Sequence, residues 1–235
     1  MRNIMFACLS LMSLNAAAQC PDSELKAEYK VINQSTTNTH TSELILWRHG
    51  AHTAHQYPQK QFTLDWTLLK NQQIKPVRYF DDAKRGIEYE PGVAIHGQVD
   101  KDWSYHYQLI SDSALTRLNL ANETGTGCER EQTLVSADGN LTVVWLPEQK
   151  LVTSLTAKSA KGQTLIQLQK TSSPEAEIRQ FFTVRDNYRL TDFADIGDDH
   201  SDPFLTKMVN LGFIQHEASG MYDSQGNALE SEHQH

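Results

Sequence analysis

The residues with the clearest potential for chemistry are three histidines in the stretch LILWRHGAHTAHQYP, residues 44–58. His49, His52 and His55 follow one another at intervals of three positions. An imidazole can serve as a nucleophile, a general base or a metal ligand near neutral pH. Whether the three imidazole rings lie close together depends on the backbone conformation. The turn between His49 and His52 therefore decides which of these roles is possible.

Gly50 and Ala51 predict a tight turn between the first two histidines. A two-residue hairpin turn of type II′ prefers glycine at its first position, where Gly50 stands. A hairpin here pairs His49 with His52 on one face of a sheet and directs His55 to the opposite face. Two convergent histidines provide half of the ligands of a tetrahedral zinc site. The hairpin therefore leaves His49 and His52 as candidate metal ligands that need further partners.

The run from an apolar strand into Arg48-His49-Gly50 also resembles the signature of the histidine phosphatase superfamily. The resemblance implies that His49 attacks phosphorus, that Arg48 holds the phosphate, and that a helix follows within an alternating α/β chain. Phosphoryl transfer also needs further positive charge around the phosphate. The three residues after the motif include no arginine. A phosphatase-like enzyme at this motif is therefore the most remote of the alternatives.

A second candidate site is the acidic stretch DFADIGDDHSDPF, residues 192–204. It places five aspartates around His200, but the order of an EF-hand loop is missing. Asp202 is also a favourable N-cap for a helix that starts at Pro203. We expect no cofactor unless this loop holds a divalent cation, in which case the protein could be hydrolytic. The candidate metal ligands of the loop are Asp195, Asp198, Asp199 and His200.

The first eighteen residues have the layout of a secretory signal peptide. Arg2 supplies a positive start, residues 4–14 form an apolar run, and alanines at positions 16–18 provide a small-residue cleavage site. The apolar run is shorter than the roughly 20 residues that span a bilayer. We expect cleavage after Ala18, export to the periplasm (or secretion, if the source is not Gram-negative), and no transmembrane segment later in the chain.

Export also bears on the cysteines and on the charge. Cys8 leaves with the signal peptide, and the oxidising compartment predicts a disulfide between Cys20 and Cys128. The chain carries 21 basic and 29 acidic residues, a formal net charge of −8. Such a chain, without a basic run, is a poor partner for nucleic acid or for anionic membrane surfaces.

Strand signals dominate the rest of the chain. Alternating apolar residues separated by turn signals such as Asp138-Gly139 predict consecutive antiparallel hairpins. One of these hairpins is expected to place Tyr79 opposite Ile87. The last hairpin along the chain is expected to pair residues 179–185 with residues 188–193.

Two segments predict helices, one over residues 102–122 and one from Pro203 to a stop at Gly212. The expected fold is mainly β (α+β): a curved antiparallel sheet or half-barrel of hairpins with two packed helices. We expect the signal peptide over residues 1–18, a single β-rich domain over residues 19–215, and a flexible polar tail over residues 216–235.

The order of hairpins, together with export, is similar to the half-barrel periplasmic carriers and sensors of the lipoprotein-carrier type. The similarity implies a non-catalytic binding, carrier or accessory protein whose concave sheet face takes an apolar small molecule, a lipid or a protein partner. The residues expected to line that face are Trp47, Val143, Trp145 and Phe182. A cation-dependent protein that uses the acidic loop is the alternative from another class.

Overall fold

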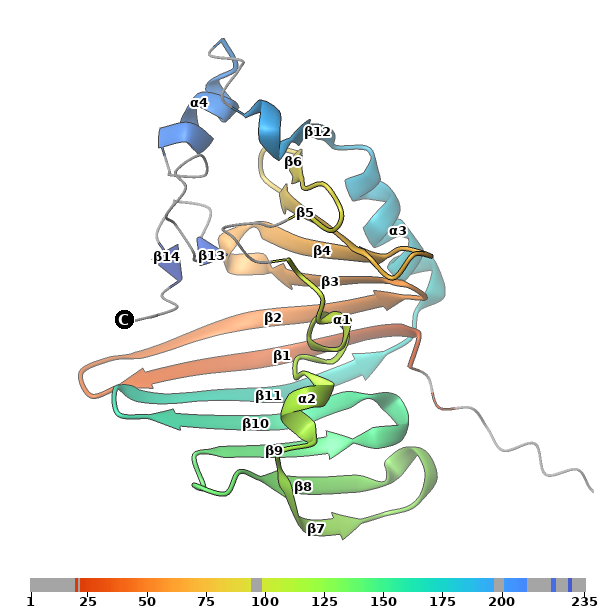
Figure 1. Cartoon of the computed structure of the whole chain (residues 1–235), viewed down its shortest axis with the longest axis vertical. Coiled ribbons are helices and arrows are strands. Elements are labelled where there is room, and N and C mark those ends of the chain that lie inside the picture. The colour runs from red at the N-terminus through yellow and green to blue at the C-terminus, as the bar shows by residue number, and fades with distance from the viewer. Residues whose placement is uncertain are drawn as a thin grey trace, which may run out of the picture.

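The structure is a computed structural model that describes residues 20, 22–93, 99–196, 201–210, 221–222 and 228–229. Twelve strands form one open, mostly antiparallel sheet in the order β12-β6-β5-β4-β3-β2-β1-β11-β10-β9-β8-β7 (Figure 1). The predicted fold class is confirmed. The strands are β1 Glu24–Ser35, β2 Thr39–His49, β3 His52–Tyr57, β4 Phe62–Leu68, β5 Ile74–Phe80, β6 Arg85–Glu88, β7 Asn119–Thr124, β8 Glu131–Val135, β9 Leu141–Leu146, β10 Leu151–Ser159, β11 Gly162–Ser172 and β12 Arg189–Asp192.

The chain builds this sheet as two runs of hairpins that meet at β1. Strands β1 to β6 follow one another outward, and the chain then crosses to β7 at the opposite edge and returns through β8, β9 and β10 to β11. β11 pairs with β1 over its whole length, and β12 joins β6 as a parallel edge strand. The helices are α1 Trp103–Gln108, α2 Asp112–Leu115, α3 Glu175–Asp186 and α4 Pro203–Asn210. A separate pair, β13 Met221–Tyr222 and β14 Ala228–Leu229, completes the described elements.

Both faces of the central strands are covered, which explains why β2 is apolar at every position of LILW. Leu44 and Leu46 pack with Leu109, at the end of α1, on one face of the sheet. Ile45 and Trp47 lie on the other face, against α3. We call the first the strap face, because α1 and α2 cross it as a strap (residues 102–118), and the second the α3 face. Figure 1 shows α1 and α2 lying over the central strands.

The hairpin predicted at Gly50 is confirmed. β2 and β3 pair His49 with His52 and Leu46 with His55. Gly50 has a φ of +59°, whereas Ala51 is not among the residues with positive φ, as a type II′ turn requires. A strand therefore follows the Arg-His-Gly motif, where the phosphatase resemblance implies a helix.

One predicted hairpin was wrong, because residues 179–185 belong to α3. Ile178, Phe181, Phe182 and Arg185 are buried at helical spacing, which makes one face of the segment a packing surface. Glu175 and Arg179 pair one turn apart on the exposed side. The phenylalanines suggested a strand, but the burial of this face beneath the sheet decides for a helix.

The helix predicted over residues 102–122 is shorter and interrupted. α1 ends at Leu109, which has a left-handed φ of +65°, and a new cap at Ser111 starts α2. From Asn119 the chain is already the edge strand β7. Four helices are therefore described rather than the expected two, and α3 was not predicted. The second predicted helix corresponds to α4, and its stop at Gly212 lies outside the described residues.

The register predicted between β5 and β6 was wrong by one residue. Tyr79 lies opposite Gly86, and Arg78 lies opposite Ile87. The prediction assumed that charged residues mark a solvent-exposed face. Arg85 contradicts that assumption, because it is buried and paired with a carboxylate of the helix α4 cap.

Candidate functional site

Arg48 is the centre of the most densely hydrogen-bonded site in the interior. Its guanidinium is fully buried and donates to backbone carbonyls from three separate segments of the chain. Nε donates to Tyr107 (2.7 Å), Nη1 to Asp22 (3.2 Å) and Gln149 (2.9 Å), and Nη2 to Lys150 (2.6 Å). Arg48 therefore joins the N-terminal segment, the strap and the turn between β9 and β10.

The electrostatics of Arg48 support a structural role. Burial lowers the pKa of this guanidinium from its usual value, and the neighbouring Tyr107, Tyr29 and Asp22 groups partly offset that effect. Four carbonyl dipoles satisfy a buried cation that would otherwise be strongly destabilising. Four of its five N–H groups bond carbonyl oxygens inside the protein, so the guanidinium is not placed to clamp a phosphate as the phosphatase resemblance implies.

The strap is anchored through polar contacts at its α1 half. The carbonyl of His106 accepts hydrogen bonds from His55 Nε2 (2.7 Å) and from Thr53 Oγ1 (3.4 Å). The ring of His106 stacks on Trp66 with a centroid distance of 4.0 Å. The Tyr107 hydroxyl also donates to the carbonyl of Asp22 (2.7 Å). With the bond from Arg48, these contacts fix α1 against the sheet.

The α2 half of the strap is held differently. Ile110, with the partly buried residues of α2 and Leu118, packs on Val143, Trp145 and Val152 of the strap face. Within the described part of the chain, residues 111–118 form hydrogen bonds only with other residues of the strap. This half of the strap is therefore attached by apolar contacts alone.

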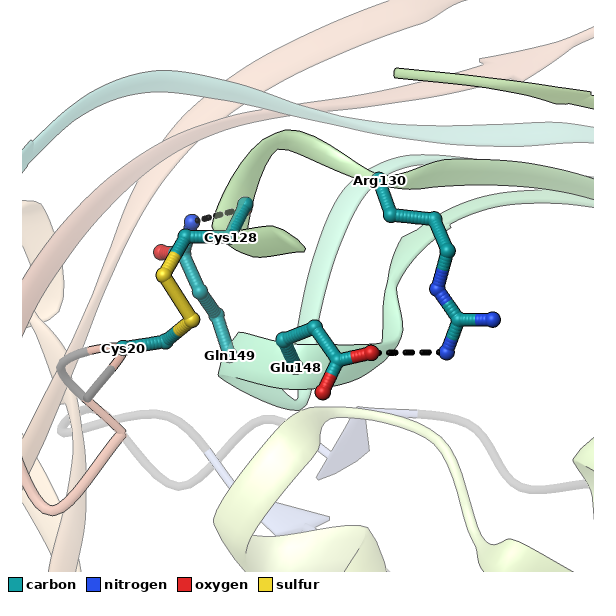
Figure 2. Close-up of a disulfide and its surroundings, with 5 residues drawn as sticks. All are labelled: Cys20, Cys128, Arg130, Glu148 and Gln149. Carbon is teal, nitrogen blue, oxygen red and sulfur yellow. Dashed lines mark hydrogen bonds and ion pairs between the residues drawn. A yellow bond between two sulfur atoms is a disulfide. The ribbon is translucent and has the colours of Figure 1, made fainter. Parts of the chain in front are cut away.

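The predicted disulfide between Cys20 and Cys128 is confirmed, with a Cα–Cα distance of 5.4 Å. Figure 2 shows that Gln149 lies beside it, where its side-chain amide donates to the Cys128 carbonyl (2.8 Å). Just before β8, Arg130 pairs with Glu148 at 2.8 Å (Figure 2). The disulfide holds the N-terminal segment two residues before Asp22, whose carbonyl is shared by Arg48 and Tyr107. It therefore supports the same junction that anchors the strap.

The three histidines do not meet. His49 bonds Glu24 at 2.8 Å and His52 bonds the buried Asp65 at 2.6 Å, and both rings face Phe182 of α3. His55 lies on the strap face, where burial first and the nearby His106 second lower its pKa to about 3. The described residues contain no group of three His, Cys, Asp or Glu side chains arranged to hold a metal ion.

The acidic loop is only partly described. Asp195 is exposed at the end of a short 3-10 turn, and Asp198, Asp199 and His200 lie outside the described residues. Asp202 caps α4 as predicted, since Oδ1 accepts from the amide of Phe204 (2.9 Å). A cation site at this loop stays a prediction.

The second carboxylate oxygen of Asp202 binds the guanidinium of Arg85 at 2.8 Å. Desolvation alone would raise the pKa of Asp202, but the Arg85 guanidinium and the Phe204 amide outweigh it and lower the pKa below its usual value. One of the five aspartates of the loop therefore has a structural role in fastening α4.

The four residues expected to line one cleft lie in two separate clusters. Trp47 and Phe182 are buried together between β2 and α3. Val143 and Trp145 are buried on the strap face beneath Ile110. The structure therefore brings only Val143 and Trp145 to the face that the strap covers.

Sequence reasoning missed Arg48 as an anchor and missed the strap itself. A signal for Arg48 was present, because a lone cation between Trp47 and a glycine turn in an otherwise apolar strand has to find acceptors if it is buried. The signal for the strap was the spacing of Leu115 and Leu118 among serines and aspartates, which was interpreted as part of a longer helix.

No family model and no curated protein sequence matches the chain. Among solved structures, PNGF-II is similar over 71% of this chain and 31% of its own length, with 10% identity and a TM-score of 0.41. The Pseudomonas aeruginosa MucA/MucB complex is similar over 67% of this chain and 56% of the matched chain, with 13% identity and a TM-score of 0.31. An outer membrane lipoprotein-sorting protein domain from Vibrio parahaemolyticus is similar over 68% of this chain and 91% of its own, with 6% identity and a TM-score of 0.23. This chain spans about a third of PNGF-II, and at these TM-scores no similarity carries a functional inference.

Within the described residues, no helix combines the length and the apolar composition needed to cross a membrane.

Proposed function

We propose that the protein is an exported, non-catalytic binding or carrier protein that takes an apolar ligand between the strap and the strap face of the sheet. The observation that carries the proposal is the unequal attachment of the strap. Its α1 half is fastened by hydrogen bonds from Arg48, Thr53 and His55, whereas residues 111–118 rest on apolar side chains alone.

An apolar ligand can replace apolar contacts without leaving a buried polar group unsatisfied. Lifting the α2 half would expose Val143, Trp145 and Val152, all of which are buried in the structure described here. An acyl chain or another apolar molecule would cover the same surface and recover the hydrophobic free energy. Lifting the α1 half would instead break several buried hydrogen bonds, each of which is costly to lose. Opening of the strap at α2 is therefore less costly than opening at α1.

Export is supported by the signal-like residues 1–18 and by the disulfide between Cys20 and Cys128, because disulfides persist in oxidising compartments. We place the protein in the periplasm, or outside the cell in a source without one. Val143 and Trp145 are the proposed lining residues. A lipid or another apolar small molecule is the proposed ligand.

Titration of the oxidised protein with N-phenyl-1-naphthylamine, an uncharged apolar fluorophore, tests the proposal. We expect saturable binding with a dissociation constant on the order of micromolar. The substitution Val143→Phe adds a ring to the packed surface beneath the strap, where the ligand would lie, and should weaken binding. Val144→Phe on the same strand provides the matched control, since neighbouring residues of a strand point to opposite faces.

Each variant should first be checked for a cooperative thermal transition, because an added ring can strain the core. Binding lost in Val143→Phe and kept in Val144→Phe supports the site. Binding that is absent in the wild-type protein, or that both variants weaken equally, rejects it.

A further inference from the structure

A hollow lies far from the strap, at the tips of two hairpins (Figure 1). β1 pairs with β11 as far as Gln34 with Gln163 and Ser35 with Gly162, so the β1–β2 and β10–β11 turns lie side by side (Figure 1). They border an open surface hollow of about 480 Å³, which we call the tip pocket. This volume falls within the roughly 300–1,000 Å³ of small-molecule sites.

The tips can approach each other because residue 162 is glycine. A Cβ at Gly162 would lie 2.0 Å from the carbonyl oxygen of Gln34, so any other residue would force the hairpins apart. Across the same pair of strands, the Thr164 hydroxyl donates to the Asn33 side-chain oxygen at 2.8 Å. The Ser35 hydroxyl accepts from the amides of its own turn. The walls of the pocket are therefore held by the protein itself.

The composition of the lining differs from that of the whole chain. Ten of its twelve residues carry a polar side chain, and none of the twelve is aspartate or glutamate, although the chain has 29 acidic residues and a net charge of −8. Within the described residues, the side chains of Gln34, His40, Lys158 and Gln163 form no hydrogen bond or ion pair. Amide donors and acceptors and a lysine thus border a shared hollow without a partner among the described residues.

We propose that the tip pocket binds a small anionic sugar, such as a hexuronic acid or a hexose phosphate. The amides of Gln34 and Gln163 match neighbouring sugar hydroxyls, which also both donate and accept. Lys158 pairs with the anionic group, and the lack of carboxylates in the lining removes local repulsion. An apolar ligand would find only Ala157 and Gly162 without a polar side chain. This site is independent of the one proposed beneath the strap.

Amide chemical shifts of the oxidised, ¹⁵N-labelled protein test the proposal, with glucuronate as the probe and glucose and inorganic phosphate as comparators. We expect saturable shifts confined to residues 33–40 and 157–164, with a dissociation constant of about 1 mM or tighter. Glucose lacks the anionic group and phosphate lacks the sugar hydroxyls. Each should therefore bind at least about tenfold more weakly than glucuronate.

The variant Lys158→Gln should weaken glucuronate binding about tenfold while leaving the rest of the spectrum unchanged. Lys170→Gln is the matched control, because Lys170 is an exposed lysine of the neighbouring strand β11 outside the lining. No saturable shift with glucuronate or with glucose 6-phosphate overturns the proposal. It is equally overturned if phosphate alone binds as well as glucuronate, if glucose does so, or if Lys158→Gln binds like the wild type.

Discussion

The guanidinium of Arg48 lies over the ring of Tyr107, with its central carbon 4.2 Å from the ring centroid, and donates to the carbonyl of the same residue. One side chain of β2 thereby fixes both the backbone and the ring of a residue in the strap. Because the Tyr107 hydroxyl in turn holds the Asp22 carbonyl, the strap, the sheet and the N-terminal segment meet at this pair.

Replacing Arg48 by methionine should strongly destabilise the protein. The variant keeps much of the buried volume but removes the Arg48 donor from four carbonyl oxygens, of which that of Asp22 keeps the Tyr107 hydroxyl. We expect the free energy of unfolding to fall by roughly 2–4 kcal/mol, with faster amide exchange in residues 103–109. Chemical denaturation and hydrogen exchange measure these effects. Arg130→Met, at a surface ion pair, is the control and should cost about 1 kcal/mol or less; a similar loss in both variants would argue against the junction.

The stability of the protein should depend on pH through His55. Its pKa in the folded state is about 3, below the 6.5 of an unfolded histidine, so protons bind preferentially to the unfolded chain. Its contribution is fully present above about pH 6.5 and is lost as pH falls toward 3, at up to about 1.4 kcal/mol per pH unit. His55→Gln keeps a donor for the His106 carbonyl but cannot titrate. Unfolding curves at several pH values should therefore show a shallower acid slope in the variant; parallel slopes would contradict this account.

Removing the disulfide should have two effects: it should destabilise the protein and it should weaken the attachment of the strap. The bridge closes a loop with a sequence separation of 108 residues, for which the chain-entropy model gives about 4–5 kcal/mol. In the double variant Cys20→Ser/Cys128→Ser we expect most of that loss, and faster exchange of the amides of α1 because Asp22 is no longer held. Denaturation under non-reducing conditions measures the first effect. Unchanged exchange in α1 would show that the bridge and the strap are uncoupled.

The attachment of α3 depends on aromatic packing against β2. Phe182 is buried and stacks on the ring of His52, while Phe181 stacks on Trp47 at a centroid distance of 4.1 Å. Phe182→Ala should lower the free energy of unfolding by roughly 3–5 kcal/mol. Val184→Ala, on the exposed side of the same helix, should change it by about 0.5 kcal/mol or less. Equal losses would mean that the contacts of Phe182 do not hold α3 in place, since both substitutions introduce the best helix former.

The parts of the fold that local chemistry dictates could be predicted. Gly50 stands where a type II′ turn needs it, and Asp202 with Pro203 starts α4 as its capping chemistry requires. The pairing of Cys20 with Cys128 followed from the expected export and from the small number of cysteines.

The parts of the fold that depend on residues distant in the chain could not be predicted from the sequence. Residues 179–185 resemble a strand until Phe181 and Phe182 find Trp47, more than a hundred positions earlier in the chain. The four residues of the predicted cleft do not lie on one face, for a related reason. Bulges at Glu28/Tyr29 and at Val152/Ser154 each shift which side chains share a face between β2 and β9. The alternation of apolar and polar residues within a single strand cannot reveal such shifts.

The position of β1 has a consequence for how the protein is made. Its two neighbours are β2, directly after it, and β11, whose last residues lie well over a hundred positions later. As the chain is made, the strands β1 to β6 emerge first, and the long free edge of β1 stays open to other chains until β11 arrives. Closing that gap is a long-range event of the kind that slows folding and invites aggregation. The pairing of β1 with β11 at the centre of the mature sheet can thus form only after strands β2 to β10 have been made.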